Sequence, residues 1–241
     1  GQQEITDGVG SAARFISPSA VLPADHGSVL VADRLSDAIR KVAPDGTVTP
    51  FAGVAGDFGA VGGTGAEARF NMPWGIAIDR DGNAYIADRG NNLVRRVTPG
   101  GVVTSAVATR DVNSNEPVGV AIDRQGNLFV VCARNTIFRV SPSSWLPVLY
   151  AGKDLTFGHN DGPAAAATFN YPLGITIGPD DTLYVTDTGN KCIRTITPQG
   201  MVGTLTITSA DIALAAPNGI AIDTAGNLYV ADRTLSTIHK I

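Results

Sequence analysis

Histidine, cysteine and methionine are scarce in this chain of 241 residues, which contains three His, two Cys and two Met. Cys132 and Cys192 lie far apart in the sequence and show no metal-type spacing, so a paired-cysteine zinc site is not expected. The histidines are scattered, and no nucleophile elbow of the Gly-x-Ser-x-Gly type occurs. The usual signatures of zinc enzymes and serine hydrolases are therefore missing. We expect both cysteines to be buried free thiols, with a disulfide as the alternative.

Charged side chains are also few, at 17% of the chain, and the net charge is −4 with an isoelectric point near 5.3. An acidic balance disfavours binding to nucleic acid. No apolar run reaches the roughly 18 residues that a membrane-spanning helix needs. We therefore predict neither a nucleic-acid partner nor a membrane span. The chain begins inside the repeat pattern described next, so we expect any leader peptide to have been removed.

Glycine and proline, by contrast, are abundant, with 28 Gly and 14 Pro. The segment 73–88 recurs with small changes at 217–232 and at 172–187, and in weaker form at two further places. The prolines that begin these five copies are Pro18, Pro73, Pro117, Pro172 and Pro217. They are separated by 55, 44, 55 and 45 residues. A period of this length is typical of a four-stranded propeller blade.

Each repeat contains four short segments of strand character. In the second repeat, a β-branched run at 75–79 is followed by a turn at 81–83 and by further strand-like runs at 83–88 and 94–97. The segment 47–52 of the first repeat is typical of the fourth strand. No stretch shows helical periodicity. Because such meanders bury both faces only by packing radially, we predict an all-β fold, a β-propeller of five four-stranded repeats that forms a single domain over residues 1–241.

The pattern Pro-x-Gly-Ile-Ala-Ile-Asp, Gly-Asn-Leu-Tyr-Val-Ala-Asp and Asn-x-Ile-Arg-Lys-Val resembles the NHL repeat. The longer repeats add an Asp-Gly-x-Gly and Ala-x-Phe insertion at 7–15, 62–70 and 161–169, which is typical of one NHL subgroup. The resemblance covers essentially the whole chain. It implies a propeller of NHL type, usually with six blades, and most often a non-catalytic module that recognises other molecules. The multiple-histidine metal site of the NHL-like amidating lyases has no counterpart here.

The fifth repeat reaches Ile241 after its third strand. We therefore expect the last blade to be incomplete, either in a five-bladed body or as part of a six-bladed parent. An exposed sheet edge is a place where another chain can add a strand. This expectation predicts possible self-association through the incomplete blade.

Positions at which the copies disagree are the best site candidates, because a purely structural role would be kept in every copy. Trp74 is the largest of the residues that follow the anchor prolines. Together with Tyr171 it could form the base of a pocket in which a sugar or an aromatic ligand stacks. His159 lies in a polar connector beside Asn160 and Asp161 and could bind a metal or shuttle a proton. The alternatives are channel-filling core residues and a solvated histidine.

Three arginines directly follow the aspartates that end second strands: Arg34, Arg89 and Arg233. A guanidinium group matches a carboxylate or phosphate in geometry, so these residues predict a partly basic rim for an anionic ligand. The alternative is that they pair with aspartates of neighbouring loops. The arginines that recur on third strands, such as Arg95, are predicted to make structural hydrogen bonds from blade to blade. The aspartates that end inner strands, such as Asp79, are predicted to accept backbone N–H bonds in the next turn.

The segment 217–223 resembles a stretch of the gluconolactonase-type propellers, in which an asparagine helps to hold calcium. This resemblance implies Asn218 as a calcium ligand. Calcium takes about six or more oxygen ligands. The acidic residues that would accompany Asn218 in such a site have no equivalents in this sequence. We therefore predict no cofactor, with Ca²⁺ kept as a possibility. The predicted function is a non-catalytic scaffold that binds a protein, peptide or glycan, with a divalent-cation-dependent lactonase or lyase as the alternative. The composition suggests an extracellular or periplasmic protein.

Overall fold

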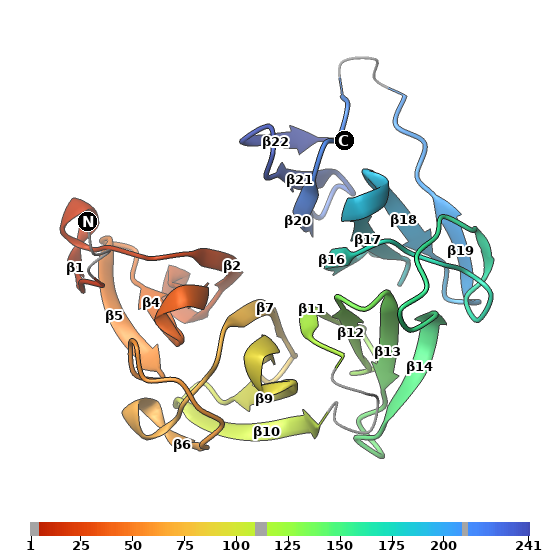
Figure 1. Ribbon diagram of the computed structural model, residues 1–241. Helices are drawn as coiled ribbons and strands as arrows, with labels where there is room; N and C mark the ends of the chain where they lie inside the picture. Colours follow the sequence, from red (N-terminus) through yellow and green to blue (C-terminus); the bar gives the residue numbers. More distant parts are fainter. Residues whose placement is uncertain (1–4, 109–114, 209–211) are drawn as a thin grey trace. The chain divides into compact units, whose positions relative to one another are not determined.

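The computed structural model describes residues 5–108, 115–208 and 212–241 (Figure 1). Its strands form five antiparallel sheets that follow one another along the chain, as predicted for a five-bladed β-propeller. The chain divides into two compact units, Gly1–Pro117 and Val118–Ile241. That a single domain spans the chain, and that the parent has six blades, stay predictions. In the described residues, no helix is long and apolar enough to cross a membrane.

The first unit contains two sheets, with strand orders β1-β5-β4-β3-β2 and β6-β10-β9-β8-β7. The strands are β1 (Gly8–Val9), β2 (Pro18–Pro23), β3 (Val29–Asp33), β4 (Ala38–Val42), β5 (Thr47–Ala52), β6 (Gly63–Thr64), β7 (Pro73–Ile78), β8 (Ala84–Asp88), β9 (Leu93–Val97) and β10 (Val102–Ala108). Short 3-10 turns connect them: η1 (Gly10–Ala12), η2 (Asp25–Gly27), η3 (Arg34–Ser36), η4 (Gly65–Glu67) and η5 (Arg89–Asn91). The core of this unit is built around Ile39, Phe70 and Ile86, none of which is exposed.

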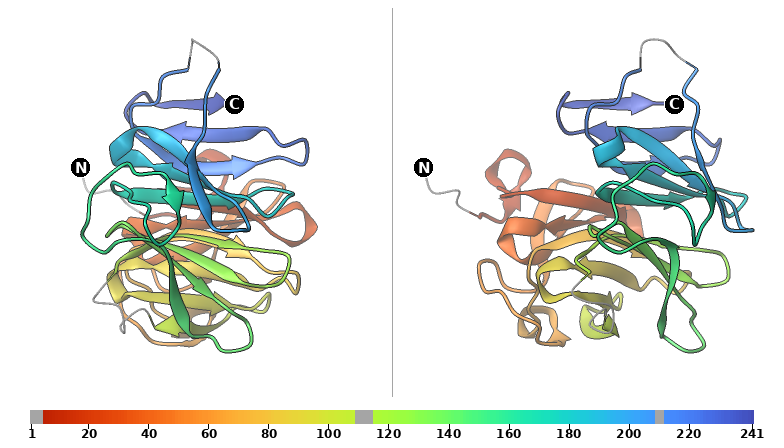
Figure 2. Two further views of the ribbon diagram at one scale, coloured as in Figure 1. Left: turned by 90° about the vertical axis from the view of Figure 1, so that its right-hand side faces the viewer. Right: turned by 45° about the vertical axis from the view of Figure 1, so that its right-hand side comes forward.

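The second unit contains three sheets, with orders β11-β12-β13-β14, β15-β19-β18-β17-β16 and β20-β21-β22 (Figure 2). The elements are β11 (Pro117–Ile122), β12 (Leu128–Cys132), β13 (Thr136–Val140), β14 (Pro147–Gly152), β15 (Gly162–Pro163), β16 (Pro172–Ile177), β17 (Leu183–Asp187), η7 (Thr188–Asn190), β18 (Cys192–Ile196), β19 (Met201–Thr204), β20 (Pro217–Ile222), β21 (Leu228–Asp232) and β22 (Thr237–Lys240). The last sheet has three strands, as predicted for the fifth repeat.

The inner strands begin at the anchor prolines and pack closely on one another. A Cβ atom added to Gly174 of β16 would lie 2.2 Å from the carbonyl oxygen of Asn218 on β20, so only glycine fits there. The turns after the inner strands are closed by aspartate, as predicted. The Oδ1 of Asp79 accepts the N–H groups of Asp81 at 2.9 Å and Asn83 at 2.8 Å.

The Asp-Gly-x-Gly insertions form the two-residue strands β1, β6 and β15, which pair with the outer strands β5, β10 and β19. In these three repeats a fully buried arginine on the third strand, Arg40, Arg95 or Arg194, binds the insertion. Arg194 donates to the carbonyl oxygens of Asn160 and Thr168 at 2.9 Å each, pairs with Asp187 at 2.9 Å, and lies 5.0 Å from the ring centre of Phe169. These side chains are therefore structural, as expected.

The direction of these bonds differs from the prediction of blade-to-blade hydrogen bonding. Arg194, like Arg40 and Arg95, binds the connector that precedes its own blade, because that connector folds back over the third and fourth strands. The third and fifth repeats lack the insertion, and they carry Phe138 and His239 at this position. The arginine therefore accompanies the insertion.

Candidate functional site

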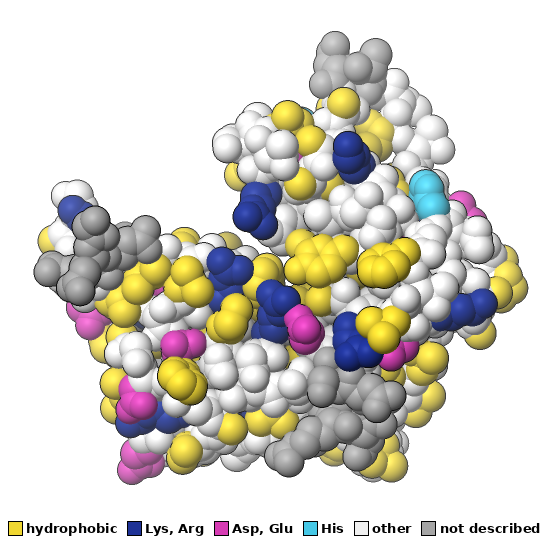
Figure 3. Space-filling model, in the orientation of Figure 1, with side chains coloured by type: hydrophobic (Ala, Val, Ile, Leu, Met, Phe, Trp, Pro, Cys, Tyr) yellow, Lys and Arg dark blue, Asp and Glu magenta, His cyan; other side chains and the backbone are white. Residues whose placement is uncertain are grey.

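The candidate functional positions are the arginines of the loops after the second strands and the aromatic residues beside the anchor prolines, Trp74 in the first unit and Tyr171 in the second. In the first unit, the 3-10 turns η3 and η5 directly follow the second strands β3 and β8 (Figure 1). Figure 3 shows Lys and Arg side chains among hydrophobic and uncharged ones at the surface. Four of the five loops begin at a buried aspartate, such as Asp33 or Asp88, that accepts N–H bonds from the residues before the anchor proline, and the third repeat has Cys132 at this position.

In the first unit, two of the predicted arginines converge on Trp74. The guanidinium carbons of Arg34 and Arg89 lie 4.5 and 4.8 Å from its ring centre. Trp74 follows the anchor proline on β7, and the two arginines begin η3 and η5, so three elements build the cluster. All three side chains belong to half-buried residues. Such cation–π contacts are each worth about 0.5–2 kcal/mol, which orders the arginines around the indole.

Polar contacts position this cluster of Arg34, Trp74 and Arg89. An Arg34 nitrogen donates to the hydroxyl oxygen of Ser17 at 3.0 Å. Arg89 makes two bonds to one carboxylate oxygen of Glu116, at 2.6 and 3.1 Å. The Glu116 side chain is 45% exposed and that of Arg89 is 19% exposed. A carboxylate therefore already occupies one guanidinium of the cluster, and it does so at the surface.

Glu116 was not predicted from the sequence. It stands directly before Pro117, at the place of Met72 and Tyr171 in the neighbouring repeats, and it is the charged one of the three. All three residues have left-handed backbone, with φ of 53°, 49° and 53° along the chain. Their N–H groups are held by side-chain oxygens of the preceding loop, that of Glu116 by Asn92 at 3.1 Å. The sequence signal that could have identified Glu116 is its charge, because the equivalent residues Met72 and Tyr171 are apolar and aromatic.

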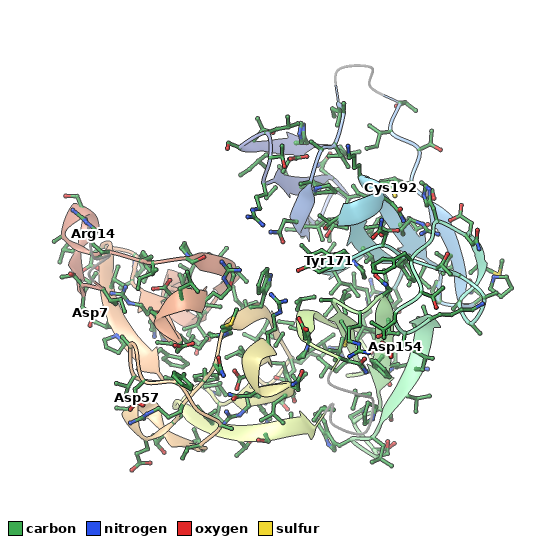
Figure 4. The ribbon with its side chains drawn as sticks, viewed as in Figure 1. Asp7, Arg14, Asp57, Asp154, Tyr171 and Cys192 are labelled. Carbon is green, nitrogen blue, oxygen red and sulfur yellow. The ribbon has the colours of Figure 1, made fainter. Side chains whose placement is uncertain are left out.

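Tyr171 lies in the second unit, immediately before β16 (Figure 4), and is 40% exposed. Its N–H group donates to the side-chain oxygen of Asn135 at 2.7 Å, which fixes the backbone. Trp74 belongs to the first unit, so a stacking pocket shared by Trp74 and Tyr171 stays a prediction.

His159 is exposed and contacts the first residue of β18 and the last residue of β19. Its Nε2 lies 3.5 Å from the Sγ of Cys192 and 3.2 Å from the Oγ1 of Thr204. The Thr204 hydroxyl donates to Asp161 at 3.1 Å, and Asp161 pairs with Arg194 at 2.5 Å. Burial raises the pKa of Asp161, but the bonds from Arg194 and Thr204 outweigh it and leave that pKa lowered.

The cysteine of this group is a poor nucleophile. Burial, and then the nearby Asp187 carboxylate, raise the pKa of Cys192 to about 12 (Figure 4). The thiol is therefore protonated at neutral pH, whereas attack requires the thiolate. Both cysteines are free, as predicted. Cys132 is buried, whereas Cys192 is half-buried, so the prediction that both are buried is wrong for Cys192. Within the described ranges, no cluster of three His, Cys, Asp or Glu side chains could hold a metal ion.

Asn218 and Arg233 lie in the fifth repeat. The backbone carbonyl of half-buried Asn218 accepts a bond from the Thr186 hydroxyl at 2.7 Å, which joins β20 to β17. Arg233 is exposed, and its N–H group donates to the carbonyl of Ala216 at 3.1 Å. These contacts involve the backbone, so the roles predicted for the two side chains stay predictions.

The aspartate that precedes Arg89 should couple stability to pH. Burial raises the pKa of Asp88 to about 6, against the opposing bonds from Asn91, from the Asn71 N–H and from Arg95. Because the ordinary value of about 3.9 applies in the unfolded chain, the folded state binds the proton more tightly. The contribution of Asp88 is therefore greatest at low pH and is lost as pH rises through about 6.

We expect the difference in unfolding free energy between the wild type and Asp88→Asn to shift by about 1 kcal/mol in favour of the wild type between about pH 7 and about pH 5. Urea unfolding at these pH values measures it. The control is Asp223→Asn, since hydrogen bonds from Asn227 lower the pKa of Asp223, so its titration lies below this window. A difference that stays constant for Asp88→Asn would contradict the account.

Sequence comparison identifies NHL repeats in this chain. The NHL repeat family model matches residues 70–97 and 169–196. A curated relative from Arabidopsis thaliana, Protein SUPPRESSOR OF QUENCHING 1, chloroplastic, is 33% identical over 95 residues. That alignment covers 35% of this chain and 9% of the relative, so the chain spans under a tenth of the relative's length.

Solved structures with similar folds include a binding protein and an enzyme. An auxiliary nutrient binding protein from Bacteroides ovatus has a TM-score of 0.72 at 16% identity, over 94% of this chain and 59% of that chain. Virginiamycin B lyase from Staphylococcus aureus has a TM-score of 0.60 at 17% identity, over 93% of this chain and 84% of that chain. At such identities the likeness shows the fold alone.

Proposed function

We propose that this chain, an NHL-repeat β-propeller, is a non-catalytic binding module whose loop face takes up a protein, peptide or glycan that carries a carboxylate. The observation that supports this function is the cluster of Arg34, Trp74 and Arg89, which places two guanidinium groups against one half-buried indole. The guanidinium groups match a carboxylate. The indole offers apolar area to the rest of the ligand. We also propose an extracellular or periplasmic location, which the composition supports.

Glu116 explains how such a ligand gains entry. Its pair with Arg89 is half-exposed, and surface ion pairs are worth only about 0–1 kcal/mol. An incoming carboxylate can therefore displace Glu116 from Arg89 at small cost. The same contact keeps the arginine extended when no ligand is bound.

Calorimetric titration with hexaglutamate and with hexagalacturonate tests the proposal. We expect one of these probes to bind. Arg34→Ala and Arg89→Ala should each weaken its affinity about tenfold, and Glu116→Gln should strengthen it severalfold. Arg80→Ala is the matched control, because Arg80 is an exposed arginine of the same repeat in the turn at 80–82. Equal losses for Arg80→Ala and Arg89→Ala would refute a specific site.

A divalent-cation-dependent lactonase or lyase is the second candidate, favoured by the fold that the chain shares with a lyase. Calcium titration of the chelated protein separates the two. The binding module should show no affinity tighter than about 10⁻⁴ M, the weak extracellular class. A third candidate, assembly through the three-stranded fifth sheet, predicts dimers in light scattering.

A further inference from the structure

The outer edge of the third sheet differs from three other edges in the chain. The outer strands β5, β10 and β19 are each covered by a two-residue strand from the preceding connector. Among the described residues, β14 pairs with β13 alone, and no further strand lies on its outer edge. The connector before this sheet spans only residues 109–116, against 53–72 before β7. In Figure 1, β14 is the rim strand of its sheet.

The side chains on this edge are apolar where the covered strands are mostly polar or small. Leu149 pairs with Phe138, and Val148 pairs with Arg139. At the register position of Leu149 the covered strands carry Pro50, Ser105 and Thr204, and at that of Val148 they carry Thr49, Thr104 and Gly203. Val148 is 65% exposed, Leu149 52% and Leu146 64%. Val148 and Leu149 are successive residues of the strand and so point to opposite faces of the sheet. Exposed apolar side chains on both faces of a sheet edge mark an interaction surface.

The turn that leads into β14 carries a tryptophan in place of glycine. In the three repeats with a covered outer strand, the turn before that strand contains a glycine with left-handed backbone. These are Gly46, Gly101 and Gly200, with φ of 84°, 79° and 77°, and the strand registers align them with Trp145. Trp145 occupies this place with a φ of 54° and is 37% exposed. A bulky side chain in left-handed backbone is disfavoured, and such strain is found at functional positions.

We propose that the strip formed by Trp145, Leu146, Val148 and Leu149 binds an extended, uncharged apolar segment of a partner protein. The segment lies antiparallel to β14, as β1, β6 and β15 lie on their outer strands, so the fold itself supplies the precedent for strand addition. This surface is separate from the cluster around Trp74.

The chemistry of the partner follows from β13. In two covered blades an aspartate of the covering segment pairs with the buried arginine of the third strand, as Asp161 does with Arg194. In the third blade Phe138 replaces that arginine, so an aspartate of a covering segment would lack this buried partner. Pro147 offers no N–H group, which limits the pairing to a few residues and leaves the apolar side chains as the main contact.

Selection from a displayed library of random dodecapeptides on the full chain tests this proposal. We expect enriched peptides to share an uncharged stretch of alternating apolar residues. The best synthetic peptide should lose at least about tenfold in affinity on Val148→Thr/Leu149→Ser, which installs the residues of β10. Met201→Thr is the matched control, since Met201 takes the place of Leu146 on covered β19 and is 47% exposed. Absent enrichment, or equal binding to the double variant, overturns the proposal.

Trp145→Gly keeps the test independent of folding. It restores the glycine of the other copies, so the melting temperature should stay or rise while peptide affinity falls. Two measurements exclude other occupants. A dimer in light scattering that dissociates in Val148→Thr/Leu149→Ser would assign the strip to a second copy. Sedimentation with phosphatidylcholine vesicles that this variant abolishes would assign it to a lipid surface. Either result overturns the assignment, whereas a monomer that stays in solution supports it.

Discussion

Replacing Arg95 by Met should lower the free energy of unfolding by about 3–5 kcal/mol. Arg95 is fully buried on β9 and pairs with the equally buried Asp88 at 3.2 Å. Its other bonds reach the carbonyl oxygens of Val61 and Arg69, 2.9 Å away, at both ends of the insertion. A methionine fills the volume, but it removes the buried counter-charge of Asp88 and the donor to the two carbonyl oxygens. The insertion should detach from the sheet before the strands separate.

Urea unfolding measures the loss, and hydrogen exchange of the insertion shows where it begins. The neighbouring Arg96 on the same strand provides the control, because it is only half-buried. Arg96→Met should change stability by no more than about 0.5 kcal/mol. Similar losses for the two variants would mean that the buried arginine does not secure the insertion.

Replacing Phe169 by Ala should cost about 3–5 kcal/mol, the range for deleting a buried aromatic ring. Phe169 is fully buried and lies under the guanidinium of Arg194 at 5.0 Å. The variant therefore removes both the packing and the cation–π contact, and it opens a cavity that the fourth sheet cannot close.

Phe157 makes a matched control for this variant. It forms a β-bridge with Phe169, but its own side chain is 68% exposed. Phe157→Ala should therefore alter the free energy of unfolding by about 0.5 kcal/mol or less. If thermal unfolding gives the same loss of stability for Phe157→Ala and Phe169→Ala, the packing described for Phe169 is wrong.

The repeat, the all-β fold and the turns were predictable because their signals are local. Alternating β-branched residues predict strands, and an aspartate such as Asp79 bonds N–H groups two and four residues ahead in its own turn. The free thiols and the three-stranded last sheet were predicted in the same way. The NHL resemblance is confirmed by the match at residues 70–97 and 169–196.

Contacts between distant segments were not predictable. Arg194 reaches the connector at 158–170 because the insertion folds back, and no pattern within the third strand encodes that direction. The sequence singled out Trp74, Arg34 and Arg89 separately, and the first unit brings them together. Their link to Glu116 depends on the left-handed backbone before Pro117, which the sequence does not reveal.

The emission of Trp74 tests the proposed binding function most directly. The chain has two tryptophans, so Trp145→Phe leaves Trp74 as the single emitter. Titration with hexaglutamate and hexagalacturonate should give a saturable change for one of them, which weakens with added salt and is lost in Arg34→Ala and Arg89→Ala but kept in Arg80→Ala. Emission that neither probe changes, or that changes equally in all variants, would contradict a carboxylate site at Trp74.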